Sequence, residues 1–263
     1  MGKYKIGIIG GGNMGEALIK GLYKQHRIFL VEANPARISI LKQRKYKISY
    51  EENPGNLLSK IDIIILAVKP QDIQYPLSWM KGVSLENKLF ISIAAGLTTN
   101  FFEKNLGGKV RVVRSMPNMP ALIARGITAI CKGRFATNGD LGIAGSILSA
   151  IGQVRVVDEK YMDAITAVSG SGPAYVFLFV EYWIAGAIAL GLSQNDAQEL
   201  VWATLIGSAE LVRFEDAREL RERVTSKGGT TQAALDVFFK GKFNQLMKNA
   251  LLAAKKRAKE LAK

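Results

Sequence analysis

The stretch "YKIGIIGGGNMGEALIKGLYK", residues 4 to 24, decides the fold of the first half of the chain. It begins as an apolar strand-forming run, passes through Gly10, Gly11 and Gly12, and continues as a helix-forming pattern. Glycines at such a junction permit a tight turn and let a pyrophosphate reach the N–H groups at the helix N-terminus. Glu32 closes the next strand-forming run, about twenty residues on, as a dinucleotide-binding unit requires. The pattern therefore favours a dinucleotide site over an ordinary glycine-rich turn.

Apolar strand-forming runs alternate with helical patterns as far as about Asp158. Such runs indicate strands buried on both faces, as in a parallel sheet flanked by helices. Beyond Glu159 only helical patterns follow. We therefore predict an α/β chain with an N-terminal Rossmann-type parallel sheet domain (residues 1–158) and an all-α dimerisation domain (residues 159–263). The predicted strands lie within residues 4–10, 27–33, 61–68, 88–95, 110–116, 126–132 and 153–158.

Composition restricts the possible sites and partners. The chain has 263 residues, 48% of them hydrophobic, enough for a sizeable core. Its single cysteine, Cys131, excludes an internal disulfide and a thiol metal cluster, so we expect no metal site and a cytoplasmic location. The net charge of +14 comes from basic residues spread along the chain without aromatic interleaving. This favours attraction of a small anionic ligand and predicts no nucleic-acid partner.

Residues 174–192, "AYVFLFVEYWIAGAIALGL", are nearly long and apolar enough to cross a bilayer. Their only charge is Glu181, and the flanks lack the character of membrane anchors. A helix that is apolar all round also suits an obligate subunit interface. We therefore expect a buried helix, no membrane and a homo-oligomer.

Three further stretches could bind ligands. "AVKP" (residues 67–70) and "AAG" (residues 94–96) follow predicted strands, at the ends where parallel sheets bind ligands, although ordinary turns would look similar. "TSKGGTTQAAL" (residues 225–235) runs through Gly-Gly into a predicted helix, with nearby hydroxyls on Ser226, Thr230 and Thr231. Such a loop can hold a carboxylate, or it can simply cap the helix.

No candidate base for oxidising a hydroxyl is apparent, because the only histidine, His26, precedes the second predicted strand, on the far side of the sheet from any cofactor. A hydride acceptor should then be electrophilic already, as a protonated C=N bond is. A second glycine-rich element, "SGSGPAYVF" from Ser169, leads into a long helix and is interpreted as structural.

Six stretches taken together resemble the pyrroline-5-carboxylate reductase family. The resemblance spans the whole chain and implies a Rossmann domain plus a helical domain that interleaves with a partner's, giving a homo-oligomer built from dimers. It also implies reduction of an anionic imine, 1-pyrroline-5-carboxylate, to L-proline by NADH or NADPH. The stretches are "IGGGNMGEALIKGL", "LAVKPQ", "SIAAGLT", "MPNMPALI", "AVSGSGPAYVF" and "VTSKGGTTQAAL".

The same resemblance assigns residues to the site. Backbone N–H groups of Ser226, Gly229, Thr230 and Thr231 would hold the substrate carboxylate, the Thr231 hydroxyl would face the ring nitrogen as the catalytic group, and Glu159 would lie near the ring. The implied cofactor-binding residues are Ile9, Gly10, Gly11, Gly12, Asn13, Met14, Asn34, Asn53, Ala67, Val68, Lys69, Ala94, Ala95 and Gly96, to which the strand-end position adds Glu32. The departures from the family pattern are Lys227, Met119 and Arg223.

The choice between the two cofactors depends on the end of the second strand. Glu32 can accept both ribose hydroxyls, and Ala33 stands where NADPH-preferring relatives often carry arginine. Asn34, Arg37 and the basic chain favour a 2′-phosphate instead. The balance slightly favours NADH.

Two other functions fit parts of the pattern. A related imine or β-hydroxyacid reductase would share both halves, but the hydroxyacid enzymes use a lysine in the first interdomain helix, which "SGSGPAYVFLFVEYW" lacks. A non-catalytic nucleotide-binding or regulatory protein would need only the first half, and the Gly-Gly-Thr-Thr loop argues against it.

Overall fold

The structure is a computed structural model that describes residues 4–52 and 54–261, and it divides into two compact units. The first, the cofactor unit, comprises Met1–Ser171 together with Ala254–Lys263, and the second, the helical unit, comprises Gly172–Ala253. The described strands are β1 (Lys5–Ile9), β2 (Arg27–Val31), β3 (Ser49–Tyr50), β4 (Ile63–Leu66), β5 (Leu89–Ser92), β6 (Arg111–Met116), β7 (Gly126–Lys132) and β8 (Gly152–Val156).

The described strands form one 8-stranded sheet in the order β3-β2-β1-β4-β5-β6-β7-β8. Each predicted run overlaps one of them, and the Rossmann-type α/β fold is confirmed. The two-residue strand β3 was not predicted, because "SY" is too short to show a pattern. The chain runs outward from β1 to β2 and β3 and then crosses to β4, so that the strand order reverses at β1, which β2 and β4 flank on opposite sides. This reversal is where sheets of this type bind ligands.

One pairing departs from the predicted parallel sheet. β6 pairs antiparallel with β7, whereas the other neighbours run parallel. The connection is short and holds a 3-10 helix, η2 (Met119–Ile123). A parallel crossover needs about a dozen residues or more, so this link can only return the chain in the opposite direction.

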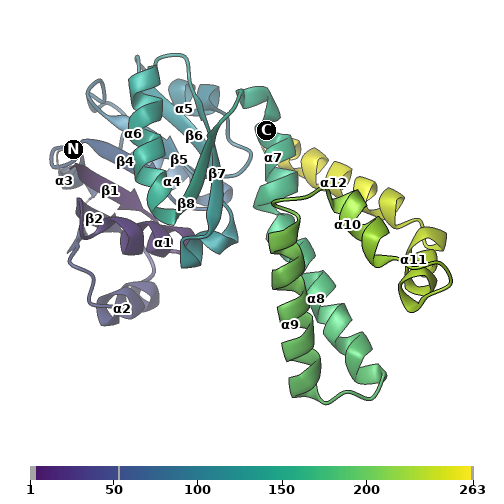
Figure 1. Cartoon of the computed structure of the whole chain (residues 1–263). Helices are drawn as coiled ribbons and strands as arrows, with labels where there is room; N and C mark the ends of the chain where they lie inside the picture. The colour runs from purple at the N-terminus through teal and green to yellow at the C-terminus, as the bar shows by residue number, and fades with distance from the viewer. Residues whose placement is uncertain (1–3, 53, 262–263) are drawn as a thin grey trace. The chain divides into compact units, whose positions relative to one another are not determined.

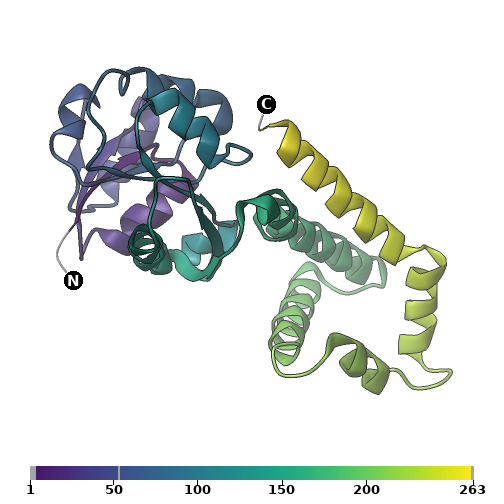
Figure 2. The same cartoon turned by 90° about the horizontal axis from the view of Figure 1, so that it is seen from above.

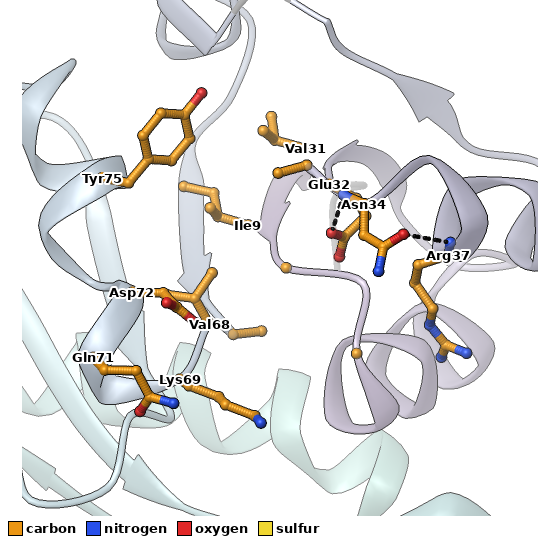
Figure 3. Close-up of a pocket in the computed structure, with 14 residues that line it drawn as sticks. Ile9, Val31, Glu32, Asn34, Arg37, Val68, Lys69, Gln71, Asp72 and Tyr75 are labelled. Atoms are coloured by element: carbon orange, nitrogen blue, oxygen red, sulfur yellow. Dashed lines mark hydrogen bonds between the residues drawn. The ribbon is translucent and has the colours of Figure 1, made fainter.

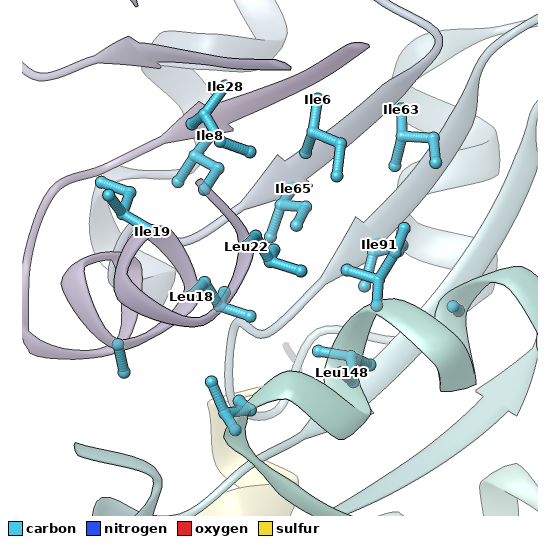
Figure 4. Close-up of a cluster of buried hydrophobic side chains, with 14 of the residues drawn as sticks. Ile6, Ile8, Leu18, Ile19, Leu22, Ile28, Ile63, Ile65, Ile91 and Leu148 are labelled. Atoms are coloured by element: carbon cyan, nitrogen blue, oxygen red, sulfur yellow. The ribbon is translucent and has the colours of Figure 1, made fainter. Parts of the chain in front are cut away.

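Helices cover both faces of the sheet (Figures 1 and 2). α1 (Asn13–Leu22) and α6 (Asn138–Leu148) pack on one face, where Leu18, Leu148, Ile6 and Ile65 meet in one buried cluster (Figure 4). On the other face Phe90, Phe102 and Leu77 are fully buried. Burying each such side chain contributes about 1.5–3 kcal/mol to folding. The helices on that second face are α3 (Pro54–Leu58), α4 (Gln74–Ser78) and α5 (Thr99–Leu106).

The remaining helices of the cofactor unit are shorter or peripheral. α2 (Pro35–Gln43) begins at Asn34, whose side chain accepts hydrogen bonds from the N–H groups of Ala36 and Arg37. After β8 the chain continues through a 3-10 turn, η4 (Glu159–Tyr161), then α7 (Met162–Ile165) and a π-helical turn, η5 (Thr166–Gly170). The other 3-10 turns are η1 (Pro70–Asp72) and η3 (Ser149–Ile151).

The helical unit consists of helices alone, as predicted. The first two pack along each other as an antiparallel pair, joined by a turn at Gly191 with φ +98° (Figure 1). Ser193 caps the second of them by accepting a hydrogen bond from the Asp196 N–H at 3.1 Å. The described helices are α8 (Gly172–Ala189), α9 (Gln194–Leu211), α10 (Ala217–Val224), α11 (Thr230–Lys240) and α12 (Phe243–Glu260), and α12 ends within the cofactor unit.

The apolar helix α8 is not buried. Of its residues, all of which are described, none is buried within the chain. The single chain does not provide the burial expected for this helix, because the helical unit offers too few neighbours to cover an apolar surface all round. By length and composition alone, Glu159–Ala189 is one described stretch that could cross a membrane.

Candidate active site

The glycine-rich turn between β1 and α1 has a backbone that only glycine fits. Gly10 has φ +102°, and a Cβ on Gly15 would lie 2.0 Å from the Gly10 carbonyl oxygen. Gly12, the N-cap of α1, gives the helix no capping side chain, and apart from its immediate chain neighbours no described residue lies within 4 Å of the position its Cβ would take. The helix N-terminus therefore faces open space beside its free N–H donors, which suits an anion.

A cavity of about 750 Å³ lies at the carboxyl ends of β1, β2 and β4 (Figure 3). Val68 and Ile9 form its floor, Tyr75 stands on one side, and Glu32 and Asn34 stand on the other. The volume falls within the range of small-molecule sites. The lining residues are Ile9, Gly10, Gly12, Val31, Glu32, Ala33, Asn34, Arg37, Ala67, Val68, Lys69, Gln71, Asp72 and Tyr75.

Glu32 is fixed by two backbone donors at the rim of this cavity. Its Oε2 accepts from the Gly11 N–H at 2.6 Å, and its Oε1 accepts from the Asn34 N–H at 2.8 Å. These bonds hold the carboxylate at the end of β2 and tie that strand end to the glycine turn. Each oxygen keeps a lone pair that could accept a hydroxyl donor.

The structure brings together most of the predicted cofactor residues. Gly11, Asn13 and Met14 lie in the same turn or the first turn of α1, outside the cavity lining. Asn53 lies outside the described residues. Gln71, Asp72 and Tyr75, which line the cavity from η1 and α4, were not predicted. The only signal for them was their position directly after "AVKP", at the strand end beside the turn.

Ala94, Ala95 and Gly96 follow β5 and do not line this cavity. Gly96 has φ +80°, and a Cβ there would lie 2.9 Å from the Leu261 Cβ and 3.0 Å from the Ala258 carbonyl oxygen. The C-terminal part of the chain therefore packs closely against this turn within the cofactor unit. A glycine is needed at residue 96 both for its backbone angle and for this close approach.

The Gly-Gly-Thr-Thr loop forms the N-terminus of α11 in the helical unit. Gly228 has φ +73°, and Gly229 occupies the N-cap, where it provides no capping side chain. The Gly229 N–H donates to the Ser226 carbonyl at 3.1 Å, which closes the turn. Because no side chain caps α11, the N–H groups of Thr230 and Thr231 in its first turn are available to an anion.

Glu159, the remaining predicted substrate residue, belongs to the cofactor unit. Its carboxylate accepts from the Thr99 N–H at 2.8 Å and from the Thr99 hydroxyl at 2.7 Å. Arg114, whose side chain is 4% exposed, lies 3.4 Å from Glu159 and 3.2 Å from Asp163. Glu159 thus joins η4 to the N-terminus of α5 and compensates a buried guanidinium. About a third of its side chain, 32%, stays exposed.

Of the three departures from the family pattern, Arg223 has a clear setting. Its guanidinium forms two hydrogen bonds with the Glu215 carboxylate, at 2.7 and 3.1 Å, on an exposed surface. Such surface pairs contribute little to stability. Met119 begins η2 and is exposed, and Lys227 is exposed in the loop before α11.

The described residues fit a dinucleotide. The open position at Gly12, the uncapped N-terminus of α1 and the carboxylate at the end of β2 match the needs of a pyrophosphate and a ribose. Two family models match the chain. "NADP oxidoreductase coenzyme F420-dependent" covers residues 5–96, and "Pyrroline-5-carboxylate reductase dimerisation" covers residues 159–261.

Comparisons with individual proteins agree with the second of these families. Pyrroline-5-carboxylate reductase of Mycobacterium tuberculosis is 36% identical over 289 residues, which cover 99% of this chain and 97% of the relative. The structure of the Coxiella burnetii reductase matches with a TM-score of 0.88 and 34% identity over 100% of both chains. The Plasmodium falciparum reductase with NADP bound matches with a TM-score of 0.90 and 31% identity, also over 100% of both. The chain belongs to the pyrroline-5-carboxylate reductase family of NAD(P)H-dependent oxidoreductases.

Proposed function

We propose that the Gly-Gly-Thr-Thr loop holds the substrate of this enzyme and that the cavity beside the glycine turn holds its cofactor. The enzyme reduces 1-pyrroline-5-carboxylate to L-proline, in the last step of proline biosynthesis. The observation that carries the loop assignment is the start of α11, where a glycine N-cap leaves the first N–H groups without a capping side chain. A carboxylate there gains hydrogen bonds and the favourable end of the helix dipole.

When bound, the reduced nicotinamide supplies the hydride that the C=N carbon of the substrate accepts. The protein's part is to position and polarise the substrate. The N–H groups of Ser226, Thr230 and Thr231 hold the carboxylate, and the Thr231 hydroxyl faces the ring nitrogen. Gly229 contributes by shaping the turn, since its N–H donates to the Ser226 carbonyl. Oriented donors of this kind act mainly by electrostatics and positioning. For Glu159 we propose a place near the ring, because a third of its side chain remains exposed and its oxygens keep acceptor capacity.

For the cofactor we propose contacts from the predicted residues that line the cavity, with additional contacts from Gly11, Asn13, Met14, Ala94, Ala95, Gly96 and Asn53. The lining residues Gln71, Asp72 and Tyr75 join this set.

We further propose that residues 159–263 work as one dimerisation domain, so that the enzyme is a homo-oligomer built from dimers. The support is the dimerisation family model over residues 159–261 and the exposed apolar surface of α8. An interface explains that surface without a membrane, and relatives in this family support a soluble protein. We place the enzyme in the cytoplasm.

Thr231→Val tests the substrate site. Losing a hydroxyl that faces the ring nitrogen should lower kcat/KM for pyrroline-5-carboxylate by about ten- to hundredfold, the scale of one charge-assisted hydrogen bond. Thr204→Val is the matched control, because the Thr204 hydroxyl donates only to the Leu200 carbonyl of its own helix, at 2.7 Å. Equal kinetics in Thr231→Val and the control would remove Thr231 from the site. Growth rescue of a proline auxotroph by the wild type tests the activity itself.

We propose a modest preference for NADH. Glu32 is held at the end of β2, where its oxygens can accept ribose hydroxyls and repel a 2′-phosphate. At about 4 Å and an effective dielectric near 20, that repulsion reaches roughly 4 kcal/mol. Glu32→Ser should therefore raise kcat/KM with NADPH relative to NADH, as measured by cofactor oxidation at 340 nm. A wild type that prefers NADPH, with no gain in the mutant, would show that Glu32 does not set the choice.

A further inference from the structure

A second carboxylate, Glu16, lies beside the glycine turn and is surrounded by donors. It stands in the first turn of α1, and its side chain is 17% exposed. The Arg37 guanidinium forms an ion pair with Oε2, the Arg44 guanidinium lies 3.3 Å from Oε1, and the Tyr46 hydroxyl donates to Oε1 at 3.5 Å.

Arg37 connects Glu16 to the cofactor cavity. It lines that cavity from the first turn of α2, on the same side as Glu32 and Asn34 (Figure 3). Its Nε donates to the Gly11 carbonyl while its Nη2 binds Glu16. The side chain is 20% exposed, so the guanidinium is held in place on two sides and its charge is compensated.

This arrangement bears on the one chemical difference between the two cofactors. NADPH carries a 2′-phosphate that needs a nearby cation, commonly an arginine at the end of the second strand of the sheet. Arg37 is a cavity-lining arginine near that strand end, and Glu16 engages it. An exposed arginine without such a partner would be free to turn toward a phosphate.

We propose that Glu16 is a specificity-determining positioning residue, which holds Arg37 against the glycine turn and so withholds it from the 2′-phosphate of NADPH. The proposal rests on the proposed cofactor site and adds a second carboxylate to Glu32 in setting the preference. Glu16 acts through Arg37 and does not touch the cofactor.

The experiment measures dissociation constants of NADPH and NADH for the full-length protein, by fluorescence titration without substrate. Glu16→Gln removes the charge that holds Arg37 and should raise NADPH affinity relative to NADH by about tenfold, the lower end of one charge-assisted contact. Weaker repulsion of the pyrophosphate affects both cofactors equally and cancels in this ratio. A purely structural role for Glu16 would also leave the ratio unchanged.

Two further variants make the result specific. In the double variant that combines Glu16→Gln with Arg37→Met, the gain in NADPH affinity relative to NADH affinity should disappear. Arg44→Met is the matched control, since it removes another cation from Glu16 without releasing Arg37, and its ratio should stay within about twofold of the wild type. A gain that persists without Arg37, or an equal gain in Arg44→Met, would overturn the proposal.

Arg37→Met alone gives an answer even if Glu16→Gln fails to fold. Because Arg37 is withheld from the phosphate, this variant should keep the wild-type ratio. A selective loss of NADPH affinity would show that Arg37 already binds the 2′-phosphate and would contradict the proposal. Failure of the proposed activity is recognised separately, as loss of pyrroline-5-carboxylate reduction in the wild type with the affinity ratios unaffected.

Discussion

The two units of the chain differ in how far their apolar residues are buried. In the cofactor unit the central strands β1, β4 and β5 are buried on both faces, and Phe90, Ile6 and Ile65 are 0% exposed. In the described helical unit only Ala197 and Val201 among the hydrophobic residues are buried, while Trp202 is 51% exposed. One unit therefore carries its own core, and the other carries the surface of a core that it does not complete.

This difference separates the requirements for cofactor binding from those for assembly. A sheet covered by helices on both faces places the glycine turn and Glu32 rigidly, so the cofactor cavity exists within one chain. An apolar surface as extensive as that of α8 is rare on a monomer and is expected at an obligate interface. The contrast supports the proposed homo-oligomer, with the helical unit as the part that needs a partner.

The largest effect is expected from charges on α8. Leu178 and Tyr182 lie one helical turn apart and are 52% and 67% exposed. An uncompensated charge buried at an interface costs roughly 3–5 kcal/mol, so Leu178→Glu with Tyr182→Glu should weaken self-association by well over about a hundredfold. Light scattering should show the wild type without a stable monomer and the variant largely dissociated and inactive.

The matched control uses the other unit. Val83 is similarly exposed, at 45%, but lies in the cofactor unit. Val83→Glu should leave the oligomer and the activity unchanged, because surface substitutions usually change stability by less than about 0.5 kcal/mol. If the wild type were a monodisperse, active monomer, an interface would no longer explain the apolar surface of α8. A membrane-associated helix would then be the remaining explanation.

A pair of phenylalanines gives the next largest effect. Phe90 is 0% exposed and Phe179 is 44% exposed. Phe90→Ala leaves a cavity in a packed core and should lower the free energy of unfolding by about 3–5 kcal/mol at every protein concentration. Phe179→Ala acts through association, so its effect on the denaturation midpoint should grow smaller as the protein is diluted.

Urea denaturation of both variants over a range of protein concentrations measures this difference. If Phe179→Ala were as destabilising as Phe90→Ala at all concentrations, the helical unit would have a core of its own, and the contrast between the units would be wrong.

Much of the cofactor unit could be predicted because its signals are local. An apolar run such as Ile63–Leu66 has few alternatives to a buried strand, and the backbone of the turn between β1 and α1 requires a glycine at Gly10. β3 could not be predicted, because two residues are too few to show the alternation of apolar and polar side chains that marks a strand. The antiparallel direction of β7 was not predicted either, because it depends on the length of the connection between β6 and β7 and not on the composition of the strand.

The site was predictable to the same extent. Glu32 stood out because an acidic residue ends the second strand, but its hydrogen bond to the Gly11 N–H depends on how two strand ends meet. The same holds for Glu159, which reaches Thr99 across 60 residues of sequence. Tyr75 and Arg37 enter the cavity from helices that follow the strand ends. The exposure of α8 could not be predicted, because it depends on how much of an apolar helix the single neighbour α9 can cover.

The smallest effect is expected for the thiol of Cys131, whose reactivity tests whether reagents in solvent reach the interior of the cofactor unit. Cys131 in β7 is 2% exposed, and burial, with a further contribution from the Glu159 carboxylate, raises the pKa of its thiol to about 12. At pH 8, four units lower, only about one thiol in ten thousand is ionised, and the thiolate is the reactive form. Native protein should therefore not react with Ellman's reagent within minutes, whereas urea-unfolded protein should release one equivalent per chain.

Because Cys131 does not react in the native protein, a second cysteine can report on the interface. We choose Val176→Cys on α8, at a position that is 45% exposed in the chain. Its thiol should be protected in concentrated protein and reactive on dilution. Reaction at the same rate at every concentration would show that nothing covers α8, and rapid reaction of the native wild type would show that the cofactor unit opens readily.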